Sequence, residues 1–437
     1  MYRGRIETLD PARPVAGSLL IADGVVIGID VADDEYDGAP DVYVVELGRG
    51  ETIRPGYMDR HLHLLAGAAR CLSVDVSRCE RVDEVLHAIA EAPTPATGWL
   101  RVWGYDDALL AEGRHLSRFE LDEVCGGRPL VLHHRSGHVV VLNSLGLESI
   151  GLADHADGVL VDAHDLVAQV PRLDEGQLGS GLRADLTAMS ERGIVSVTDA
   201  THTNDLAALE LISRLSGRVG PRIEAMVGAD RLSGLSYGSQ VGDVAVGHAK
   251  VMPVEGRDDL MAQQVGMARE AGFPVAVHVM DVDTLAVALE ALGSSSPPRG
   301  TVDRLEHAAL ALPEQLDEIA RLGLYVVTQP SFVVHRGAKY RTELSEVERE
   351  WLWPVASLID RGVGVGFSSD SPVVPAAPLE WIAAASEREI GPGEAVDEAI
   401  AVTLASAGPM REGIEVAMLV IEHNSEHRPL TPPKPFS

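Results

Sequence analysis

The feature that most constrains the fold is an alternation of apolar runs of strand length with amphipathic stretches of helix length. GIVSVTDAT (193–201) and FPVAVHVMD (273–281) are such runs, and PEQLDEIARLG (313–323) is a helix-length stretch ending in glycine. Alternation of this kind predicts a parallel sheet covered by helices. The runs are continuously apolar, which is typical of strands buried on both faces. We therefore expect an α/β fold for the middle of the chain.

An eight-stranded barrel fits this pattern, although the sequence offers nine candidate strands. One of the candidates at 129–136, 222–230 and 244–253 is then not a barrel strand, and the pattern leaves open which one. The stretch from about 93 to 192 is too long for a plain strand–helix connection. We interpret part of it as an inserted, lid-like segment.

The two chain ends have a different pattern. AGSLLIADGVVIGIDV (16–31) predicts two short strands around Asp23-Gly24, because Asp-Gly between apolar runs favours a tight hairpin. EVAMLVIEHN (415–424) predicts one more strand near the carboxyl end. The predicted division is therefore a β unit at 1–52, the barrel with its insertion at 53–390, and a return to β structure at 391–437.

The charge balance is strongly acidic, with 66 Asp and Glu against 36 Lys and Arg and a formal net charge of −30. This argues against nucleic acid or an anionic membrane surface as the main partner. No apolar window is long enough for a membrane span, and the start, MYRGRIETLDP, lacks the apolar core of a signal peptide. The three cysteines are a sparse set that favours a reducing compartment. We expect a cytoplasmic protein.

The most informative segment for function is PGYMDRHLHL (55–64), which carries His61 and His63 at the end of a predicted strand. Residues two apart in an extended chain point to the same side. Two imidazoles on one side of a strand end can bind one metal ion. A pair of exposed histidines near a turn is the simpler interpretation of this segment alone.

Other strands also end in polar residues. His278, His307 and Asp370 come at the ends of three predicted strands, and Lys250 lies late in a fourth that is otherwise apolar. The carboxyl ends of parallel barrel strands meet at one mouth, where active sites are found. Four such strand ends beside a His-x-His pair favour a functional cluster over buried structural histidines.

The donor types indicate a divalent metal. Neutral imidazole and carboxylate suit Zn²⁺ best, with Mn²⁺ or Fe²⁺ as competitors. A bound ion would activate water, and Asp370 could accept the proton and pass it to a leaving group. Lys250 has two interpretations that the sequence does not separate. A deprotonated lysine can take up CO₂ to become a carbamate ligand, and a charged lysine would pair with a carboxylate.

The segments PGYMDRHLH, AKVMP, AVHVMD, RLEHA and FSSDSPV together resemble the amidohydrolase superfamily. Further segments, including VWGYDDALLAEGR, RSGHVVVLNSLGL and SSDSPVVPAAPLEWI, resemble its family 3 branch, which includes proteins similar to N-substituted formamide deformylases. The likeness runs in order from about Ile21 to Ile421. It implies a distorted (β/α)₈ TIM barrel with a small β-sandwich built from both chain termini.

The resemblance also implies roles for the candidate residues. His61 and His63 would hold a first metal, and His278 and His307 a second. Lys250, carboxylated, would bridge the two. Asp370 would contact the first metal and act as general base while metal-activated hydroxide attacks an amide-type C–N bond.

Several other residues are weaker candidates. His202, after the strand at 193–201, could polarise a carbonyl as a second catalytic group. His138, Trp103 and Gln329 are candidates for contacts with the substrate. His138 and Asn143 lie in the same segment, and for both a structural role in a hydrogen-bonded loop is an equal alternative. For Trp103 the alternative is packing in the protein interior.

We therefore expect a metal-dependent amidohydrolase that acts on a small molecule, with one or two ions per chain. A mononuclear aminohydrolase (deaminase), with Lys250 as a bystander, is the alternative within enzymes. A metal-free scaffold of the same fold is the alternative outside them. A homodimer is the default expectation for the assembly.

Overall fold

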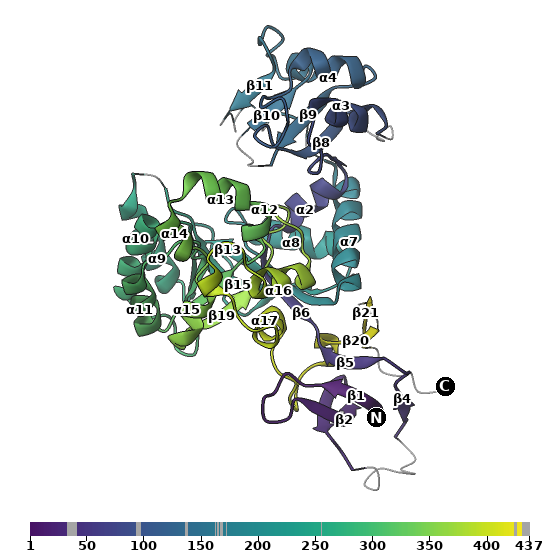
Figure 1. Cartoon of the computed structure of the whole chain (residues 1–437), viewed down its shortest axis with the longest axis vertical. Coiled ribbons are helices and arrows are strands. Elements are labelled where there is room, and N and C mark those ends of the chain that lie inside the picture. The colour runs from purple at the N-terminus through teal and green to yellow at the C-terminus, as the bar shows by residue number, and fades with distance from the viewer. Residues whose placement is uncertain are drawn as a thin grey trace. The chain divides into compact units, whose positions relative to one another are not determined.

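The computed structural model describes residues 1–32, 42–92, 98–135, 139–161, 163, 166, 169–171, 173–254, 256–423 and 426–430. Its internal contacts divide the chain into two compact units. One comprises Met1–Leu64 with Leu186–Ser437, and the other is Leu65–Asp185 (Figure 1). Helices α2 (Leu64–Cys71) and α7 (Glu175–Glu191) carry the chain across the two boundaries.

The larger unit contains the predicted barrel. Its parallel strands are β6 (Tyr57–Leu62), β12 (Ile194–Asp199), β13 (Arg222–Gly228), β15 (Val244–Val251), β16 (Val275–Val279), β17 (Arg304–His307), β18 (Tyr325–Thr328) and β19 (Gly364–Phe367). Each pairs in parallel with the next, and β14 (Gln240–Val241) adds a short antiparallel ladder to β15. A parallel bridge between Leu62 and Ser371 brings the first and last strands together. The α/β-barrel prediction is confirmed.

Helices follow the barrel strands as the alternating pattern predicted. They are α8 (Leu206–Ser216), α9 (Asp258–Glu270), α10 (Val282–Gly293), α11 (Pro313–Leu322), α12 (Phe332–His335), α13 (Gly337–Glu343), α14 (Glu346–Glu350), α15 (Val355–Asp360), α16 (Pro378–Ser386) and α17 (Glu398–Ala405), with single 3₁₀ turns at Pro392–Glu394 and Val416–Met418. Figure 1 shows α9, α10 and α11 side by side on the outside of the barrel. Helix α11 starts with proline and ends at Gly323, whose φ of 65° is the left-handed conformation that glycine adopts without strain.

Both chain ends contribute to one seven-stranded sheet, in agreement with the prediction of a β unit shared by the termini. Its strands are β1 (Tyr2–Glu7), β2 (Val15–Ala22), β3 (Val25–Ile29), β4 (Val45–Glu46), β5 (Thr52–Pro55), β20 (Leu419–His423) and β21 (Glu426–Pro429). The hairpin of β2 and β3 turns at Asp23-Gly24, and both residues have positive φ. The side chains of Ile6, Leu19 and Leu419 are fully buried in its core.

The unit Leu65–Asp185 has a sheet of its own. Its five strands are β7 (Val74–Asp75), β8 (Leu100–Tyr105), β9 (Leu130–His134), β10 (Val139–Leu142) and β11 (Val159–Val161), and its short helices are α3 (Val82–Ala90), α4 (Arg118–Val124) and α5 (Ser144–Ser149). Strand β9 is the candidate at 129–136, so this candidate is the one outside the barrel. The compact unit begins at Leu65, whereas the insertion was predicted at about 93 to 192.

Candidate metal centre

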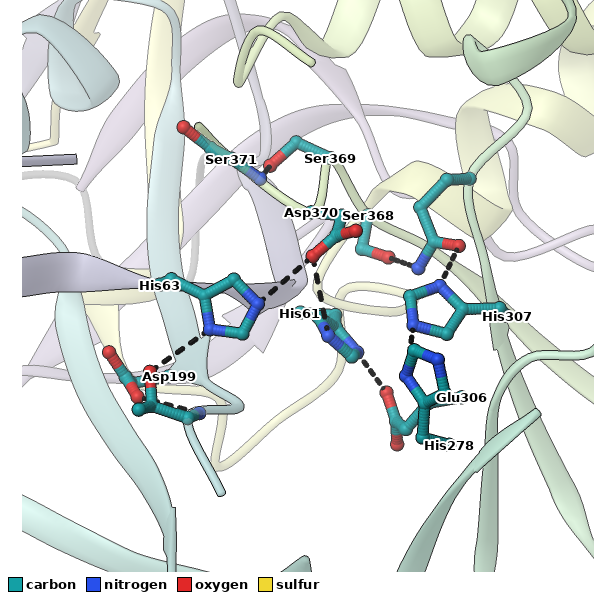
Figure 2. Close-up of polar contacts among 12 residues, drawn as sticks. His61, His63, Asp199, His278, Glu306, His307, Ser368, Ser369, Asp370 and Ser371 are labelled. Atoms are coloured by element: carbon teal, nitrogen blue, oxygen red, sulfur yellow. Dashed lines mark hydrogen bonds and ion pairs between the residues drawn. The ribbon is translucent and has the colours of Figure 1, made fainter. Parts of the chain in front are cut away.

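Three side chains of types that can bind a metal ion meet where the first and last barrel strands come together. His61 Nε2 lies 3.5 Å and His63 Nε2 lies 3.1 Å from Asp370 Oδ1 (Figure 2). The three ligand atoms all lie within 4.8 Å of one another. The backbone fixes this arrangement, because the Asp370 amide donates a 2.8 Å hydrogen bond to the carbonyl oxygen of His61.

Hydrogen bonds to the other ring nitrogens orient both imidazoles. His61 Nδ1 lies 2.5 Å from Glu306 Oε2, and His63 Nδ1 lies 3.0 Å from Thr201 Oγ1 (Figure 2). Because the ionised Glu306 accepts from Nδ1 of His61, the lone pair of His61 Nε2 is left facing Asp370. The Thr201 hydroxyl can donate or accept, so it orients the His63 ring without fixing its tautomer. Such outer hydrogen bonds are what fix the tautomer and ring orientation of metal-binding histidines.

A second pair of imidazoles lies on neighbouring strands. His278 Nδ1 is 3.1 Å from His307 Nε2, and the rings of His307 and His61 are 4.7 Å apart. His307 Nδ1 faces Gln329 Oε1 at 2.8 Å, and the Gln329 amide donates to Ser368 Oγ at 2.8 Å. Gln329 is fully buried and both ends of its amide have partners, so the structure favours a role in positioning His307 over the predicted contact with substrate.

A buried ion pair lies behind His61. Arg304 Nε and Nη2 donate to the two oxygens of Glu306 at 2.8 and 3.1 Å, and the Glu306 side chain is completely buried. Burial alone would raise the pKa of Glu306, but the positive charges of Arg304 and Lys250 outweigh it and lower that pKa. Glu306 therefore stays ionised, and as an acceptor it keeps the proton of His61 on Nδ1.

Burial keeps most of the imidazoles neutral. It lowers the pKa of His278 to about 3 and the pKa values of His61 and His307 well below the ordinary range. His63 differs: burial lowers its pKa, but the Asp370 carboxylate outweighs burial and the net shift is upward. Neutral imidazole is the form that binds a metal ion.

Lys250 lies in β15 and is only 2% exposed. Its Nζ has no hydrogen-bond partner among the described residues. Burial lowers its pKa to about 8, although the carboxylates of Glu306 and Asp370 oppose the shift. A buried polar group without a hydrogen-bond partner is costly. The lowered pKa increases the share of neutral amine, which is the form of lysine that reacts with CO₂.

Two buried aspartates hold the backbone around these residues. Asp59 Oδ1 accepts from the amides of His61 and Ser369 at 3.3 and 3.0 Å, and burial raises the Asp59 pKa to about 7. Asp199 Oδ2 accepts from the Leu64 amide at 2.7 Å. Sequence reasoning missed both. For Asp59 a signal existed, because it lies two residues before His61 and so on the same side of the strand.

The backbone is strained at two of the strand ends. His307 and Asp370 have φ values of 70° and 63°, and Ala308, next to His307, has a φ of 46°. Non-glycine residues in this region cost roughly 1–3 kcal/mol each, and such strain tends to gather at functional sites. It turns the side chains of His307 and Asp370 where a regular strand would not place them.

Of the remaining candidates, His202 lies near enough to the cluster for the charges of Lys250 and His63 to act on its ring. His202 is exposed after β12, and partial burial and the positive charge of Lys250 lower its pKa. Trp103 belongs to β8 in the unit Leu65–Asp185, so its contact with substrate stays a prediction. His138 lies outside the described residues. Asn143 is buried, caps α5 and bonds the Leu130 amide, which favours the structural alternative.

The donor set fits a divalent ion. Asp370 Oδ1 accepts no hydrogen bond from the described residues, although two imidazole nitrogens lie within 3.5 Å of it. Ligands of a tetrahedral ion with bonds of about 2.0–2.1 Å are spaced by about 3.3 Å, which is close to these separations. The fold and this cluster together define the class: an α/β barrel with a candidate metal centre at the carboxyl ends of its strands.

The chain belongs to the amidohydrolase family, because a profile of that family matches residues 48–410. The N-substituted formamide deformylase of Arthrobacter pascens is 26% identical over 467 residues, which cover 92% of this chain and 86% of the relative. These findings confirm the resemblance and support a hydrolase.

Solved structures agree on the fold. An uncharacterized metal-dependent hydrolase from Pyrococcus furiosus superposes with a TM-score of 0.79 at 22% identity, covering 96% of this chain and 98% of that one. A guanine deaminase from C. acetobutylicum superposes with a TM-score of 0.55 at 12% identity, covering 96% and 90%. Within the described part of the chain, none of the helices combines the length and the apolar character that crossing a membrane requires.

Proposed function

We propose that this protein hydrolyses an amide-type C–N bond of a small molecule at the carboxyl ends of its barrel strands. The observation that carries the proposal is the convergence of His61 Nε2, His63 Nε2 and Asp370 Oδ1 within 4.8 Å. The similarity to an N-substituted formamide deformylase supports an N-acyl or N-formyl substrate.

The residues present fit two divalent ions. His61, His63 and Asp370 would hold one, and His278 and His307 the other. Lys250, as a carbamate, would serve both. A bound divalent ion of the zinc type supplies Lewis acidity and lowers the pKa of water.

The chain's own side chains supply the proton transfers. Asp370 accepts a proton from the attacking water and returns it to the departing nitrogen, so that the carbonyl carbon gains a hydroxyl and the amine leaves neutral. Glu306 and Thr201 hold the imidazoles of His61 and His63 in the required orientation. His202, with its lowered pKa, is neutral at pH 7 and can donate a hydrogen bond to the substrate carbonyl.

The buried amine of Lys250 favours this arrangement over a mononuclear deaminase. A bystander lysine would be expected to pair with a carboxylate, whereas Lys250 Nζ has no hydrogen-bond partner among the described residues. Metal content per chain, measured with and without added bicarbonate, separates the two. An additional ion that binds only when bicarbonate is present supports the amidohydrolase, and a metal content that bicarbonate does not change supports the deaminase.

The direct test is a panel of N-formyl, N-acyl and cyclic imide compounds, assayed with the metal-loaded protein by release of amine. Turnover that disappears on removal of metal and in Asp370→Asn supports the proposal. Release of ammonia from an aminated ring, with no amide hydrolysed, would replace it with a deaminase.

A further inference from the structure

The unit Leu65–Asp185 contains a second group of metal-binding side chains. Asp106 and Asp107 directly follow β8, and His134 ends β9. The two strands are parallel neighbours, and Tyr105 is paired with His134 in their register. Because parallel neighbours present their carboxyl ends at the same edge, these side chains meet there.

The spacing of the three donors suits a shared ion. His134 Nε2 lies 3.1 Å from Asp107 Oδ1 and 3.6 Å from Asp106 Oδ1, and all three ligand atoms lie within 4.8 Å of one another. The 3.1 Å separation is that of an ordinary hydrogen bond of about 2.7–3.2 Å, and the 3.6 Å separation is longer. Both are close to the spacing of about 3.3 Å between ligands of a tetrahedral ion.

Two further residues support the group from behind. His115 Nδ1 lies 3.4 Å from Asp107 Oδ1 and 3.2 Å from the hydroxyl of Tyr105. The buried Tyr105 ring packs edge-on against the His134 ring, with centroids 5.0 Å apart. These contacts restrict the orientation of His134, as residues behind metal ligands do.

We propose that Asp106, Asp107 and His134 bind a divalent cation, Zn²⁺ or Mn²⁺, with water completing its coordination. One imidazole and two carboxylates are the hard-to-borderline donors that these ions prefer. The ion joins the carboxyl ends of β8 and β9 and stabilises this unit. The proposal is independent of the proposed function, since none of its ligands belongs to the barrel strands.

A simple ion pair is the competing explanation, and the chain contains one for comparison. His155 Nδ1 lies 3.5 Å from Asp157 Oδ1 in the same unit, where no third donor completes a candidate metal group among the described residues. The group at β8 and β9 differs in bringing a third donor, a second carboxylate, within reach of the same largely buried imidazole.

The test measures Zn²⁺ bound per full-length chain, by equilibrium dialysis and elemental analysis, in the wild type and in His134→Gln. The control is His133→Gln, which changes the preceding residue of the same strand, whose side chain points to the opposite face. Absorption of bound Co²⁺ in the visible range provides a readout that does not depend on enzyme activity.

We expect His134→Gln to bind one equivalent less than the wild type, and His133→Gln to bind the same number. Asp107→Asn, a near-isosteric change at a partly exposed residue, should also lose this equivalent or bind it at least tenfold more weakly. If His134→Gln does not fold, Asp107→Asn provides the test of the site. The same loss should occur when Asp370→Ala has already weakened the barrel site. Unchanged binding in Asp107→Asn, or an equal loss in His133→Gln, would overturn the proposal.

Discussion

At the scale of single residues, the hydrogen bond on one ring nitrogen decides what the other can do. Glu306 and Thr201 bind Nδ1 of His61 and His63, and this leaves both Nε2 atoms facing Asp370. A strand end with two histidines would not by itself create this arrangement. The orientation depends on residues that are 245 and 138 positions away in the chain.

Asp370→Asn tests the general base. The amide cannot accept the proton of water as a carboxylate does, so we expect kcat to fall by roughly 10²–10⁴-fold. The stability should change little, because the backbone bond from residue 370 to His61 is retained. Steady-state kinetics with the best substrate of the panel measures the effect. Asp317→Asn, at an exposed ion pair with Arg361, is the matched control and should keep full activity. Equal activity of both variants would exclude Asp370 as the base.

Glu306→Gln tests the support of His61. The substitution removes the charge that pairs with buried Arg304 and leaves one amide oxygen in place of the two carboxylate oxygens that face Arg304 and His61. We expect metal affinity to fall by about 10–100-fold, and the free energy of unfolding to fall by about 3–5 kcal/mol. Metal titration and urea unfolding measure the two effects.

Glu318→Gln is the control for Glu306→Gln, because it removes the same charge from an exposed pair with Arg321 on α11. Such pairs contribute about 0–1 kcal/mol. If both variants lost the same small amount of stability and bound metal normally, the Arg304–Glu306 pair would have no special role.

At the scale of elements, the sequence predicted which residues end the strands better than it predicted which strands pair with one another. The sequence placed His278, His307 and Asp370 at the ends of apolar strands, and the structure has them there. It did not separate the β9 segment from the barrel strands, because an apolar parallel strand has the same pattern in either sheet. Asp199 and Thr201 were missed because their hydrogen-bond partners, Leu64 and His63, follow β6, and the pairing of β6 with β12 brings them together.

Two glycines test how helix position determines the effect of a side chain. Gly323 ends α11 with φ of 65°, and Gly266 lies inside α9 without positive φ; an added Cβ at either would contact nothing within 4 Å. We expect Gly323→Ala to destabilise by about 1 kcal/mol. Gly266→Ala should stabilise by about 0.5–1 kcal/mol. Urea unfolding measures the change in the free energy of unfolding for both variants. Changes of the same sign would contradict the expected difference between the end and the interior of a helix.

At the scale of the whole molecule, buried neutral imidazoles make stability depend on pH. Burial lowers the pKa of His278 to about 3, of His133 and His248 to about 4, and of His61 and His307 far below the usual range. Between these values and the ordinary value of about 6.5, only the unfolded chain binds the protons. The contribution of these residues is therefore complete above pH 6.5 and is lost as the pH falls.

We expect the free energy of unfolding of the chelator-treated protein to fall below pH 6.5. Each imidazole contributes a slope of up to about 1.4 kcal/mol per pH unit. The raised pKa of His63 does not offset this, since its contribution is already complete below pH 6.5. Asp59, with its pKa raised to about 7, opposes the loss by the slope of one group, because below pH 7 the folded chain binds a proton that the unfolded carboxyl does not. The net slope is therefore that of the imidazoles less one group. Urea unfolding between pH 7 and 5 measures the slope. Constant stability over this interval would mean that these rings are accessible to protons in the folded chain.

The central claim is that a divalent ion binds between His61, His63 and Asp370. Diffraction data collected on both sides of the zinc absorption edge, from crystals grown with zinc, test it directly. The account predicts an anomalous peak about 2.0–2.2 Å from His61 Nε2, His63 Nε2 and an oxygen of Asp370. Zinc peaks elsewhere on the protein, with none at this position, would contradict it.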